Sequence, residues 1–237
     1  MSRPSVSVDE LAKRYGDVQA LDSVSFEVRR GEIFGLVGPN GAGKSTTLRT
    51  LATLLHVDDG DVTVCGHDVE QEAIDVRESI RYLPDEAGAY ESISGRKNLR
   101  FVADFYGDAD ECLDRGVEMA DLGERIDDAA GEYSKGMTRK LLLASALMTD
   151  PDLVILDEPT SGLDVRNSRK VREIIKSYPD EDRSVLLSSH DMLEVEYLCD
   201  RVGLLNDGQI VAQGSPAELL ERYDVANLED VFMEVVA

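Results

Sequence analysis

The sequence predicts one α/β domain, residues 1–237, built on a mainly parallel sheet with an antiparallel β subdomain and an inserted α-helical subdomain. Strands that alternate with helices over most of the chain are typical of a parallel sheet. A glycine-rich loop at 38–46 joins an apolar strand to a helix. Apolar residues spaced three and four apart between 94 and 149 indicate consecutive helices. We therefore expect a helical subdomain at about 86–149 and a short C-terminal tail at about 224–237.

The composition is acidic, with 48 Asp and Glu residues against 25 Lys and Arg residues and a net charge of −23. The acids are spread along the chain, which indicates a solvated acidic surface and not an interaction segment. Such a surface repels nucleic acids and anionic lipid headgroups, so we expect no nucleic-acid partner. It also repels itself, and high salt relieves that repulsion. We therefore predict a protein of a halophile, from a cytoplasm with very high salt.

No secreted or membrane-spanning segment is expected. The first residues lack an apolar core, and no apolar run approaches the length of about 18 residues that a bilayer requires. Cys65, Cys112 and Cys199 are far apart and form no CxxC pair. They favour buried apolar positions in a reducing cytosol over a metal or redox site.

The first elements are expected to be antiparallel strands, because residues 5–11 and 23–28 alternate apolar and polar side chains. Between them we predict a turn at 13–17 that exposes Tyr15. Its ring is expected either to stack on a nucleotide base or to pack at the strand end. The apolar run at 33–37 predicts a buried strand that leads into the glycine-rich loop.

That loop has the pattern Gly-x-x-x-x-Gly-Lys-Ser of a phosphate-binding loop. The predicted nucleotide-binding residues are Gly38, Pro39, Asn40, Gly41, Ala42, Gly43, Lys44, Ser45 and Thr46. Gly38, Gly41 and Gly43 are expected to adopt positive φ, so that backbone N–H groups close around a polyphosphate. We expect Lys44 to reach the β- and γ-phosphates and the Ser45 hydroxyl to bind Mg2+. A glycine-rich turn without a ligand is the alternative.

The rest of the chain alternates helices and strands around the helical insertion. Helices are expected to about 55 and at 69–78, 95–106, 109–122, 137–149, 165–177, 192–199 and 216–223, the last ending the core. Strands are expected at 61–65, 80–83, 153–156, 184–188, 202–205 and 209–212. The continuous apolar run at 153–156 indicates a central parallel strand.

Two carboxylates, Asp157 and Glu158, directly follow that strand. Ligands of open α/β sheets bind at the carboxyl ends of the strands. We therefore expect Asp157 to bind Mg2+, in most cases through water, and Glu158 to activate the attacking water as a general base. Acids that merely end a strand are the alternative, which the phosphate-binding loop disfavours.

Together these motifs resemble the ATP-binding subunit of an ABC transporter, and the likeness covers nearly the whole chain. Residues 157–164, Asp-Glu-Pro-Thr-Ser-Gly-Leu-Asp, match the family's acidic strand motif and the D-loop after it. Residues 188–190, Ser-Ser-His, match its switch-histidine motif. Residues 133–137, Tyr-Ser-Lys-Gly-Met, resemble the signature motif of drug-resistance and sodium-extrusion exporters, and residues 228–232 resemble the ending of that branch.

The resemblance implies a P-loop ATPase of the ABC type, with ATP and Mg2+ as ligands. Two such domains, expected to be copies of this chain, would pair head-to-tail. Ser134 and Gly136 of one copy would then contact the γ-phosphate bound by the other, while an ordinary helix cap is the alternative for Ser134. His190 would contact the γ-phosphate and the attacking water, so Glu158 and His190 are the predicted catalytic residues. Tyr15 falls where the family stacks adenine.

The resemblance also implies a separate polytopic membrane permease, which places this chain at the cytoplasmic face of the cell membrane. ATP would close the dimer, hydrolysis would reopen it, and the helical subdomain would move the permease. The coupling segment of the permease is expected at loop 85–94 and the start of the next helix. The exporter-like signature and ending favour export over uptake.

Two positions depart from the family pattern. Asp85 stands where glutamine usually follows Tyr-Leu-Pro. An aspartate can accept from a metal-bound water but cannot donate as an amide does, so Asp85 is still predicted at the metal. The usual Leu-Ser-Gly-Gly-Gln is Tyr-Ser-Lys-Gly-Met here, and Lys135 either lies near the phosphate or points to solvent.

A soluble ABC-type ATPase of DNA repair, translation or cofactor assembly is the main alternative. The chain has no long coiled-coil insertion and no basic patch, which disfavours the nucleic-acid versions. A nucleotide-gated binding protein that barely hydrolyses ATP is a third hypothesis, and the presence of Glu158 and His190 argues against it.

Overall fold

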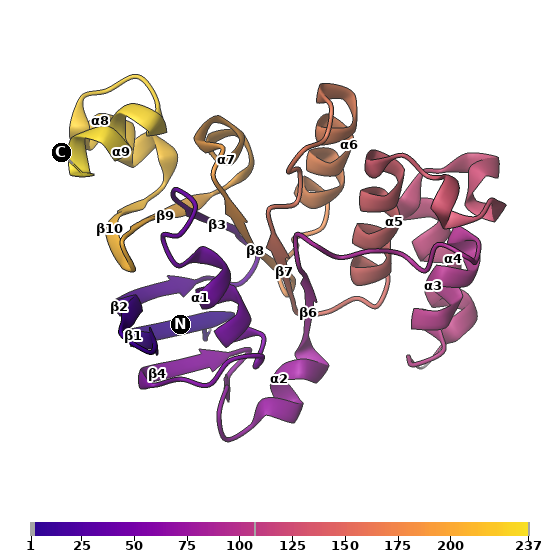
Figure 1. Ribbon diagram of the computed structural model, residues 1–237, viewed down its shortest axis with the longest axis horizontal. Helices are drawn as coiled ribbons and strands as arrows, with labels where there is room; N and C mark the ends of the chain where they lie inside the picture. The colour runs from indigo at the N-terminus through magenta and orange to yellow at the C-terminus, as the bar shows by residue number, and fades with distance from the viewer. Residues whose placement is uncertain (1–2, 107, 237) are drawn as a thin grey trace.

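The computed structural model describes residues 3–106 and 108–236, which form two β-sheets and the helices around them (Figure 1). The strands are β1 (Val6–Tyr15), β2 (Val18–Val28), β3 (Ile33–Val37), β4 (Asp59–Val64), β5 (His67–Asp68), β6 (Ile80–Leu83), β7 (Leu153–Asp157), β8 (Ser184–Ser189), β9 (Arg201–Asn206) and β10 (Gln209–Gly214). The helices are α1 (Lys44–Leu51), α2 (Ala73–Ser79), α3 (Gly95–Ala103), α4 (Ala109–Ala120), α5 (Lys135–Leu147), α6 (Val165–Lys176), α7 (Met192–Leu198), α8 (Pro216–Tyr223) and α9 (Leu228–Val236), with 3₁₀ turns η1 (Gly123–Asp127) and η2 (Ala130–Glu132).

The larger sheet has six strands in the order β10-β9-β3-β8-β7-β6. Its neighbouring strands are parallel, except that β10 pairs antiparallel with β9 at the edge. Strands β3, β7 and β8 are buried along their whole length, which is why their sequences are so apolar. Because these strands run parallel, the glycine-rich loop, Asp85, Glu158 and His190 all follow strands at the same edge of the sheet.

The smaller sheet is antiparallel, with the strand order β2-β1-β4-β5. Helix α1 contacts strands of both sheets (Figure 1). Its Leu48 and Leu51 are fully buried in one core with Val8 of the smaller sheet and Ile155 of the larger sheet. Burial of this apolar side fixes the direction of α1 and therefore the position of the loop at its N-terminus.

A second core lies between the larger sheet and helices α6 to α9. Val171 of α6, Val195 of α7, Leu219 of α8 and Val231 of α9 are fully buried there with Val185 of β8. Together the two cores cover both faces of the sheet, as its uniformly apolar strands require.

Helices α3, α4 and α5 form a separate helical layer with a core of its own, on the right in Figure 1. Leu99 of α3, Cys112 of α4 and Leu141 of α5 are buried in that core. The Ser94 hydroxyl caps α3 by accepting from the Lys97 N–H. One side of α5 faces this layer, and the other side reaches the core of the larger sheet through Leu143 and Leu147.

The fold prediction, a mainly parallel sheet with an antiparallel β subdomain and added helices, is confirmed, but three local expectations are wrong. β1 continues through Tyr15, so the turn expected at 13–17 contains only the two residues before β2. The helix expected at 69–78 is the shorter α2, because β5 and a turn precede it. The expected tail at 224–237, whose last residue lies outside the described range, contains helix α9 packed into the core.

Two of the cysteines are chemically protected by their surroundings. Burial raises the pKa of the Cys65 thiol to about 12 and raises that of Cys199 well above its usual value. A thiol with such a pKa is not ionised at neutral pH, so it is a poor nucleophile and metal ligand.

Among the described residues, no helix has both the length and the apolar character needed to cross a bilayer.

Candidate functional site

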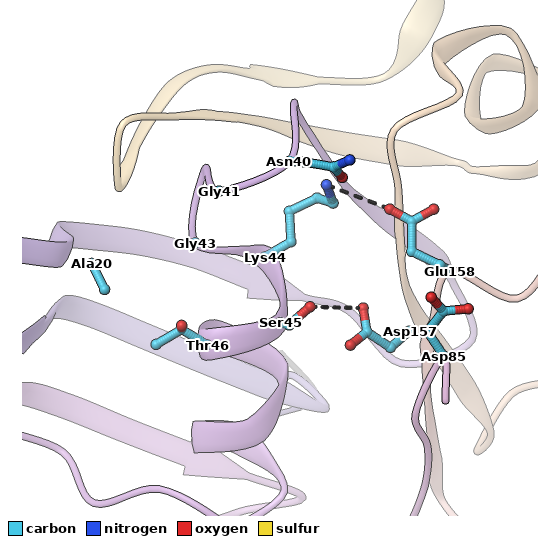
Figure 2. Close-up of a pocket in the computed structure, with 10 residues that line it drawn as sticks. All are labelled: Ala20, Asn40, Gly41, Gly43, Lys44, Ser45, Thr46, Asp85, Asp157 and Glu158. Carbon is cyan, nitrogen blue, oxygen red and sulfur yellow. Dashed lines mark hydrogen bonds and ion pairs between the residues drawn. The ribbon is translucent and has the colours of Figure 1, made fainter. Parts of the chain in front are cut away.

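An open cleft of about 250 Å³ lies between the N-terminus of α1 and the ends of β6 and β7 (Figure 2). It is lined by Ala20, Asn40, Gly41, Gly43, Lys44, Ser45, Thr46, Asp85, Asp157 and Glu158. All of these except Ala20 are predicted site residues. The structure therefore brings together two stretches that are more than 100 positions apart in the sequence.

The loop before α1 needs glycine for two different reasons. Gly41 and Gly43 have left-handed φ angles of 87° and 109°, which would strain any other residue. Gly38 does not share this conformation, so the expectation of positive φ at Gly38 is wrong. Instead, a side chain at Gly38 would collide with the Leu205 carbonyl of β9. Pro39 and Ala42 also belong to the loop, but neither lines the cleft.

Lys44 is the first residue of α1 and is only 6% exposed. Its Nζ donates to the Gly38 carbonyl at 2.7 Å and to the Pro39 carbonyl at 3.2 Å. It also lies 3.4 Å from Oε1 of Glu158 (Figure 2). A buried cation is costly without such partners. The loop and the opposite strand end thus hold the ammonium group inside the cleft.

Asp157, at the end of β7, is 3% exposed and accepts hydrogen bonds from three hydroxyl groups. Its Oδ1 accepts from Ser188 at 2.5 Å and from Ser45 at 3.2 Å, and its Oδ2 accepts from Tyr82 at 3.3 Å. Burial and the neighbouring Asp157 charge raise the pKa of the Tyr82 hydroxyl, so Tyr82 remains a donor at neutral pH. The carboxylate is therefore fixed in position before any ligand arrives.

Glu158 follows in a left-handed conformation, with φ of 47°. This conformation costs a non-glycine residue about 1–2 kcal/mol, and residues strained in this way cluster at functional sites. The Glu158 N–H donates to Ser188 Oγ at 3.1 Å. Its carboxylate lies between Lys44 and His190, whose Nδ1 donates to Oε2 at 2.8 Å. The turn thus directs Glu158 toward the phosphate-binding loop (Figure 2).

Asp85 reaches the cleft from the loop after β6, where it is exposed. His190 does not line the cleft and is connected to it through Glu158. Tyr15 is 48% exposed at the end of β1, and it also lies outside the lining. The strand-end position expected for Tyr15 is therefore present, while the base-stacking role is left to a proposal.

The other two predicted residues, Ser134 and Gly136, lie at the N-terminus of α5 and do not line the cleft of the same chain. The exposed Ser134 hydroxyl accepts from the Met137 N–H at 3.3 Å, which is the helix-cap arrangement. Gly136 is buried, and a side chain there would collide with Asn167 of α6. In the single chain, both residues thus serve the packing and capping of α5.

Sequence reasoning missed three residues that hold the site together. Ser188 contacts both Asp157 and Glu158, and Tyr82 contacts Asp157. Each is the second-to-last residue of a strand that pairs with β7. Their positions beside the strand-end motifs could have pointed to them. Arg139 donates to the carbonyls of Asp157 and Glu158 from α5, and its position within a helix offered no such signal.

The chemistry of these donors fits a nucleoside polyphosphate and Mg2+. Left-handed glycines, a buried ammonium group and the N-terminus of α1 together form a cradle for phosphate oxygens. The Ser45 hydroxyl and the Asp157 carboxylate, with Asp85 nearby, supply the hard oxygen ligands that Mg2+ prefers.

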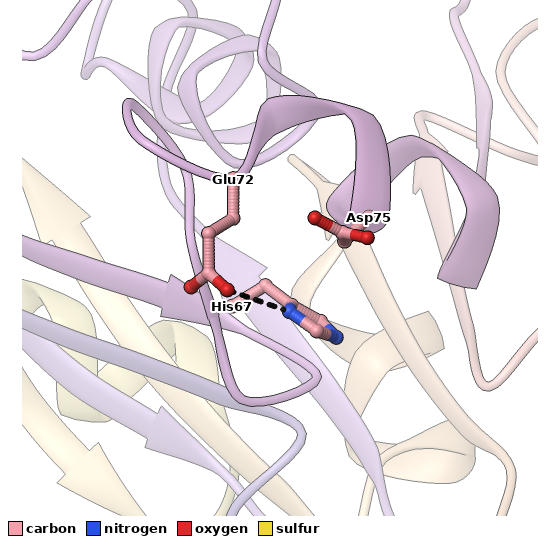
Figure 3. A group of neighbouring side chains, drawn as sticks. All are labelled: His67, Glu72 and Asp75. Carbon is pink, nitrogen blue, oxygen red and sulfur yellow. Dashed lines mark hydrogen bonds and ion pairs between the residues drawn. The ribbon is translucent and has the colours of Figure 1, made fainter.

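A second group of metal-ligand residues, His67, Glu72 and Asp75, lies around the turn between β5 and α2 (Figure 3). Their ligand atoms all lie within 4.8 Å of one another. However, Glu72 already accepts from the Asp68 N–H at 3.0 Å and from His67 Nδ1 at 3.3 Å. These hydrogen bonds close the turn and account for the cluster without a metal.

Comparisons with known proteins agree with this geometry. The family model described as "ABC transporter" matches residues 21–161. The chain is 39% identical to the daunorubicin resistance ATP-binding protein DrrA3 of Streptomyces coeruleorubidus, over 92% of this chain and 71% of that protein. It is 37% identical to the Nod factor export ATP-binding protein I of Burkholderia pseudomallei (strain 1710b), over 93% of this chain and 74% of that protein. A solved structure, described as an ATP-binding subunit of an ABC transporter, has a TM-score of 0.88 and 28% identity and covers 98% of this chain and 99% of its own.

Proposed function

This chain belongs to the ABC transporter ATP-binding family, and we propose that it is the ATP-hydrolysing motor subunit of an exporter. One observation carries the proposal more than any other. The Glu158 carboxylate lies across from the phosphate-binding loop, held between Lys44 and His190. This is the arrangement that hydrolysis of a bound triphosphate needs, because it combines a phosphate cradle with a base directed at it.

In the proposed complex, the loop N–H groups and the N-terminus of α1 bind the phosphates. Lys44 gives up its loop carbonyls and donates to phosphate oxygens instead. Ser45 and Asp157 would hold Mg2+, with Asp85 close enough to assist, and the bound ion would supply positive charge next to the phosphates. Tyr15 stacks on the adenine from the end of β1.

We propose Glu158 as the general base that takes a proton from the attacking water. His190 orients the carboxylate through its Nδ1 and senses the γ-phosphate. A second copy of the chain completes the site, with its Ser134 hydroxyl and Gly136 N–H on the γ-phosphate. The exposed N-terminus of α5, whose dipole favours an anion, supports that contact.

A separate polytopic permease would bind the helical subdomain at the cytoplasmic face of the membrane. Three aromatic residues support this choice of surface: Tyr90, Phe101 and Phe105 are 59%, 48% and 72% exposed. Their rings contact one another edge-on, with centroids 5.3 Å and 5.5 Å apart. Exposed apolar clusters of this kind mark interaction sites. The relatives named for drug resistance and for export favour export as the direction of transport.

The ATPase half of the proposal is tested by Glu158→Gln. The variant should bind ATP as the wild type does, hydrolyse it at least about 100-fold more slowly, and accumulate as an ATP-bound dimer in light scattering. Glu221→Gln, at an exposed position of α8, is the matched control and should leave turnover unchanged. Turnover at the wild-type rate in Glu158→Gln would show that Glu158 is not the base.

The transport half is tested by purification of the tagged chain from its native membranes in high salt. A stoichiometric polytopic protein should co-purify and would identify the permease. Recovery of the chain with soluble partners alone would contradict the transporter role and would support a soluble ABC-type ATPase, while the site chemistry would stand.

We also propose that the protein works in high salt, because its net charge of −23 opposes compaction at low ionic strength. Dialysis into low salt should lower the melting temperature and the ATPase rate together. If both stay the same, the halophile interpretation is wrong.

A further inference from the structure

One buried guanidinium group joins three segments around the cleft. Arg139 of α5 is 7% exposed, and within the described residues its hydrogen bonds all end on backbone carbonyls. Its Nη2 donates to Asp157 at 2.8 Å and to Glu158 at 3.1 Å. Its Nε donates to Pro159 at 2.8 Å, and its Nη1 donates to Pro84 at 3.1 Å.

Direct ion pairing does not explain this arrangement. In residues 3–106 and 108–236, no carboxylate lies within 4.0 Å of the Arg139 guanidinium group. Burial lowers the pKa of Arg139, the charges of Asp85, Asp157 and Glu158 oppose that shift from a greater distance, and a guanidinium stays protonated in proteins. The chain therefore buries a charge whose contacts are carbonyl oxygens. A planar group with five donors suits several carbonyls at once, which a lysine ammonium does not.

The carbonyls that Arg139 contacts belong to the strained turn after β7. Glu158 has the left-handed φ of 47°, and its carbonyl accepts both from Arg139 and from the Ser161 N–H, the latter at 3.1 Å. Such conformations persist only where the surroundings over-determine them. On the other side, the Pro84 carbonyl directly precedes Asp85, where the chain enters the helical subdomain.

We propose that Arg139 is a positioning residue, which holds Glu158 in its left-handed turn and makes hydrolysis depend on the placement of α5. The inference rests on the proposed function, in which Glu158 is the general base. Its physical basis is that Ser134, where a second copy would bind, caps α5, and that the same helix carries Arg139 about one turn further on. A shift of α5 therefore moves the donor that fixes the base, and small misplacements of a base cost large factors in rate.

The test uses Arg139→Lys in the full chain, because lysine keeps the buried charge but cannot span four carbonyls. We expect ATP affinity to stay within about twofold, since the phosphate-binding loop is untouched, and kcat to fall about 10- to 100-fold. Hydrogen exchange without nucleotide should be faster at the Ser161 N–H, which is bonded to the Glu158 carbonyl. Arg139→Gln, which keeps donors without charge, serves if the lysine variant does not fold.

Lys140→Met is the matched control. Lys140 is the next residue of α5 and is also 7% exposed, but its Nζ donates to the Asp121 carbonyl at 2.6 Å, inside the helical subdomain. Its loss should lower the melting temperature without changing the KM, the kcat or the exchange at Ser161. An equal change of kcat in both variants would overturn the positioning role.

A double-mutant cycle shows whether Arg139 acts through Glu158. In the Glu158→Gln background, Arg139→Lys should cause no further loss of single-turnover rate, because the base is already absent. The same fold-loss in both backgrounds would overturn the inference. Wild-type turnover in Glu158→Gln alone would instead overturn the proposed role of Glu158 as the base. The exchange experiment at Ser161 tests the turn itself, so its result does not depend on that role.

Discussion

The carboxyl edge of the larger sheet and the N-terminus of α5 hold the two sets of predicted ATP-binding residues, and the chain supports them very differently. Lys44 and Asp157 are 6% and 3% exposed. Carbonyls of its own loop and the Glu158 carboxylate hold Lys44, and hydroxyl groups of distant segments hold Asp157. Ser134 is exposed, and its hydroxyl accepts from its own helix. The difference teaches that contacts within one chain already fix the residues of the cleft, whereas the start of α5 is exposed, as the proposed contact with a second copy requires.

The helical subdomain also carries the exposed aromatic cluster of Tyr90, Phe101 and Phe105, on a layer with a separate core. The two regions share α5, and Arg139 joins that helix to the turn of Glu158. Substitutions in the cleft should therefore affect ATP binding by the isolated chain, while substitutions at exposed positions of the helical subdomain should affect its assemblies.

Lys44→Ala should have the largest effect. It removes a buried cation that phosphate oxygens would contact, so ATP binding should weaken by about 3 kcal/mol, or more than about 100-fold in Kd. Isothermal titration of the isolated chain measures this loss. Lys135→Ala makes the same charge change at an exposed position of α5 and should leave ATP binding to the monomer intact. Equal losses of affinity in both variants would contradict the separation of roles between the cleft and the exposed surface of the helical subdomain.

The double substitution Tyr90→Ser and Phe101→Ser should act on assembly alone. Loss of two exposed aromatic anchors should weaken co-purification with the permease by about 2 kcal/mol, or about 30-fold in Kd. The ATPase rate of the isolated chain should not change, because neither ring lines the cleft. Tyr197→Ser, at a 61% exposed tyrosine on α7, is the control and should leave both properties intact. Weaker ATP turnover in the double variant would show that the two regions are not separable.

Gly136→Ala distinguishes between two explanations for the glycine at this position, which are close packing within the chain and contact with a bound phosphate. The added methyl group would collide with Asn167, so the free energy of unfolding should fall by about 1–2 kcal/mol. Thermal melting should detect this loss, and Asn167→Ala in the same chain should recover part of it. A wild-type melting temperature for Gly136→Ala would show that packing does not require this glycine, leaving the contact with phosphate as its explanation.

The cleft was predictable from the sequence because each of its parts is encoded locally. Lys44, Asp157 and His190 all lie at or shortly after the ends of apolar strands, and parallel strands bring their carboxyl ends to one edge. The left-handed turn at Glu158 and the network around Ser188 were not predictable, since they arise from contacts between strands that are distant in the sequence. The reason for glycine at position 38 was not predictable either, because the Leu205 carbonyl that excludes a side chain there belongs to a strand much further along the sequence.

The helical region was predictable in outline, from the period of its apolar residues, but its contacts were not. Arg139 follows the signature motif like any surface arginine of a helix, and only the packing of α5 against the end of β7 buries it. Helix α9 was missed for a related reason. Its apolar residues Leu228 and Val231 have helical spacing, but the segment is short and lies at the end of the chain, and its packing against the core supplies the stability that isolated short helices lack.

Asp85→Gln should have the smallest effect, because Asp85 lies where the two regions meet and is exposed there. If Asp85 acts on Mg2+ through water, its charge contributes at most about 1 kcal/mol, so the Mg2+ concentration for half-maximal hydrolysis should rise by no more than about fivefold. Glu86→Gln, at the exposed position next to it, should produce no rise. An increase above about tenfold would mean that Asp85 binds the metal directly. Metal binding in the cleft would then require Asp85, which is the first residue of the loop into the helical subdomain.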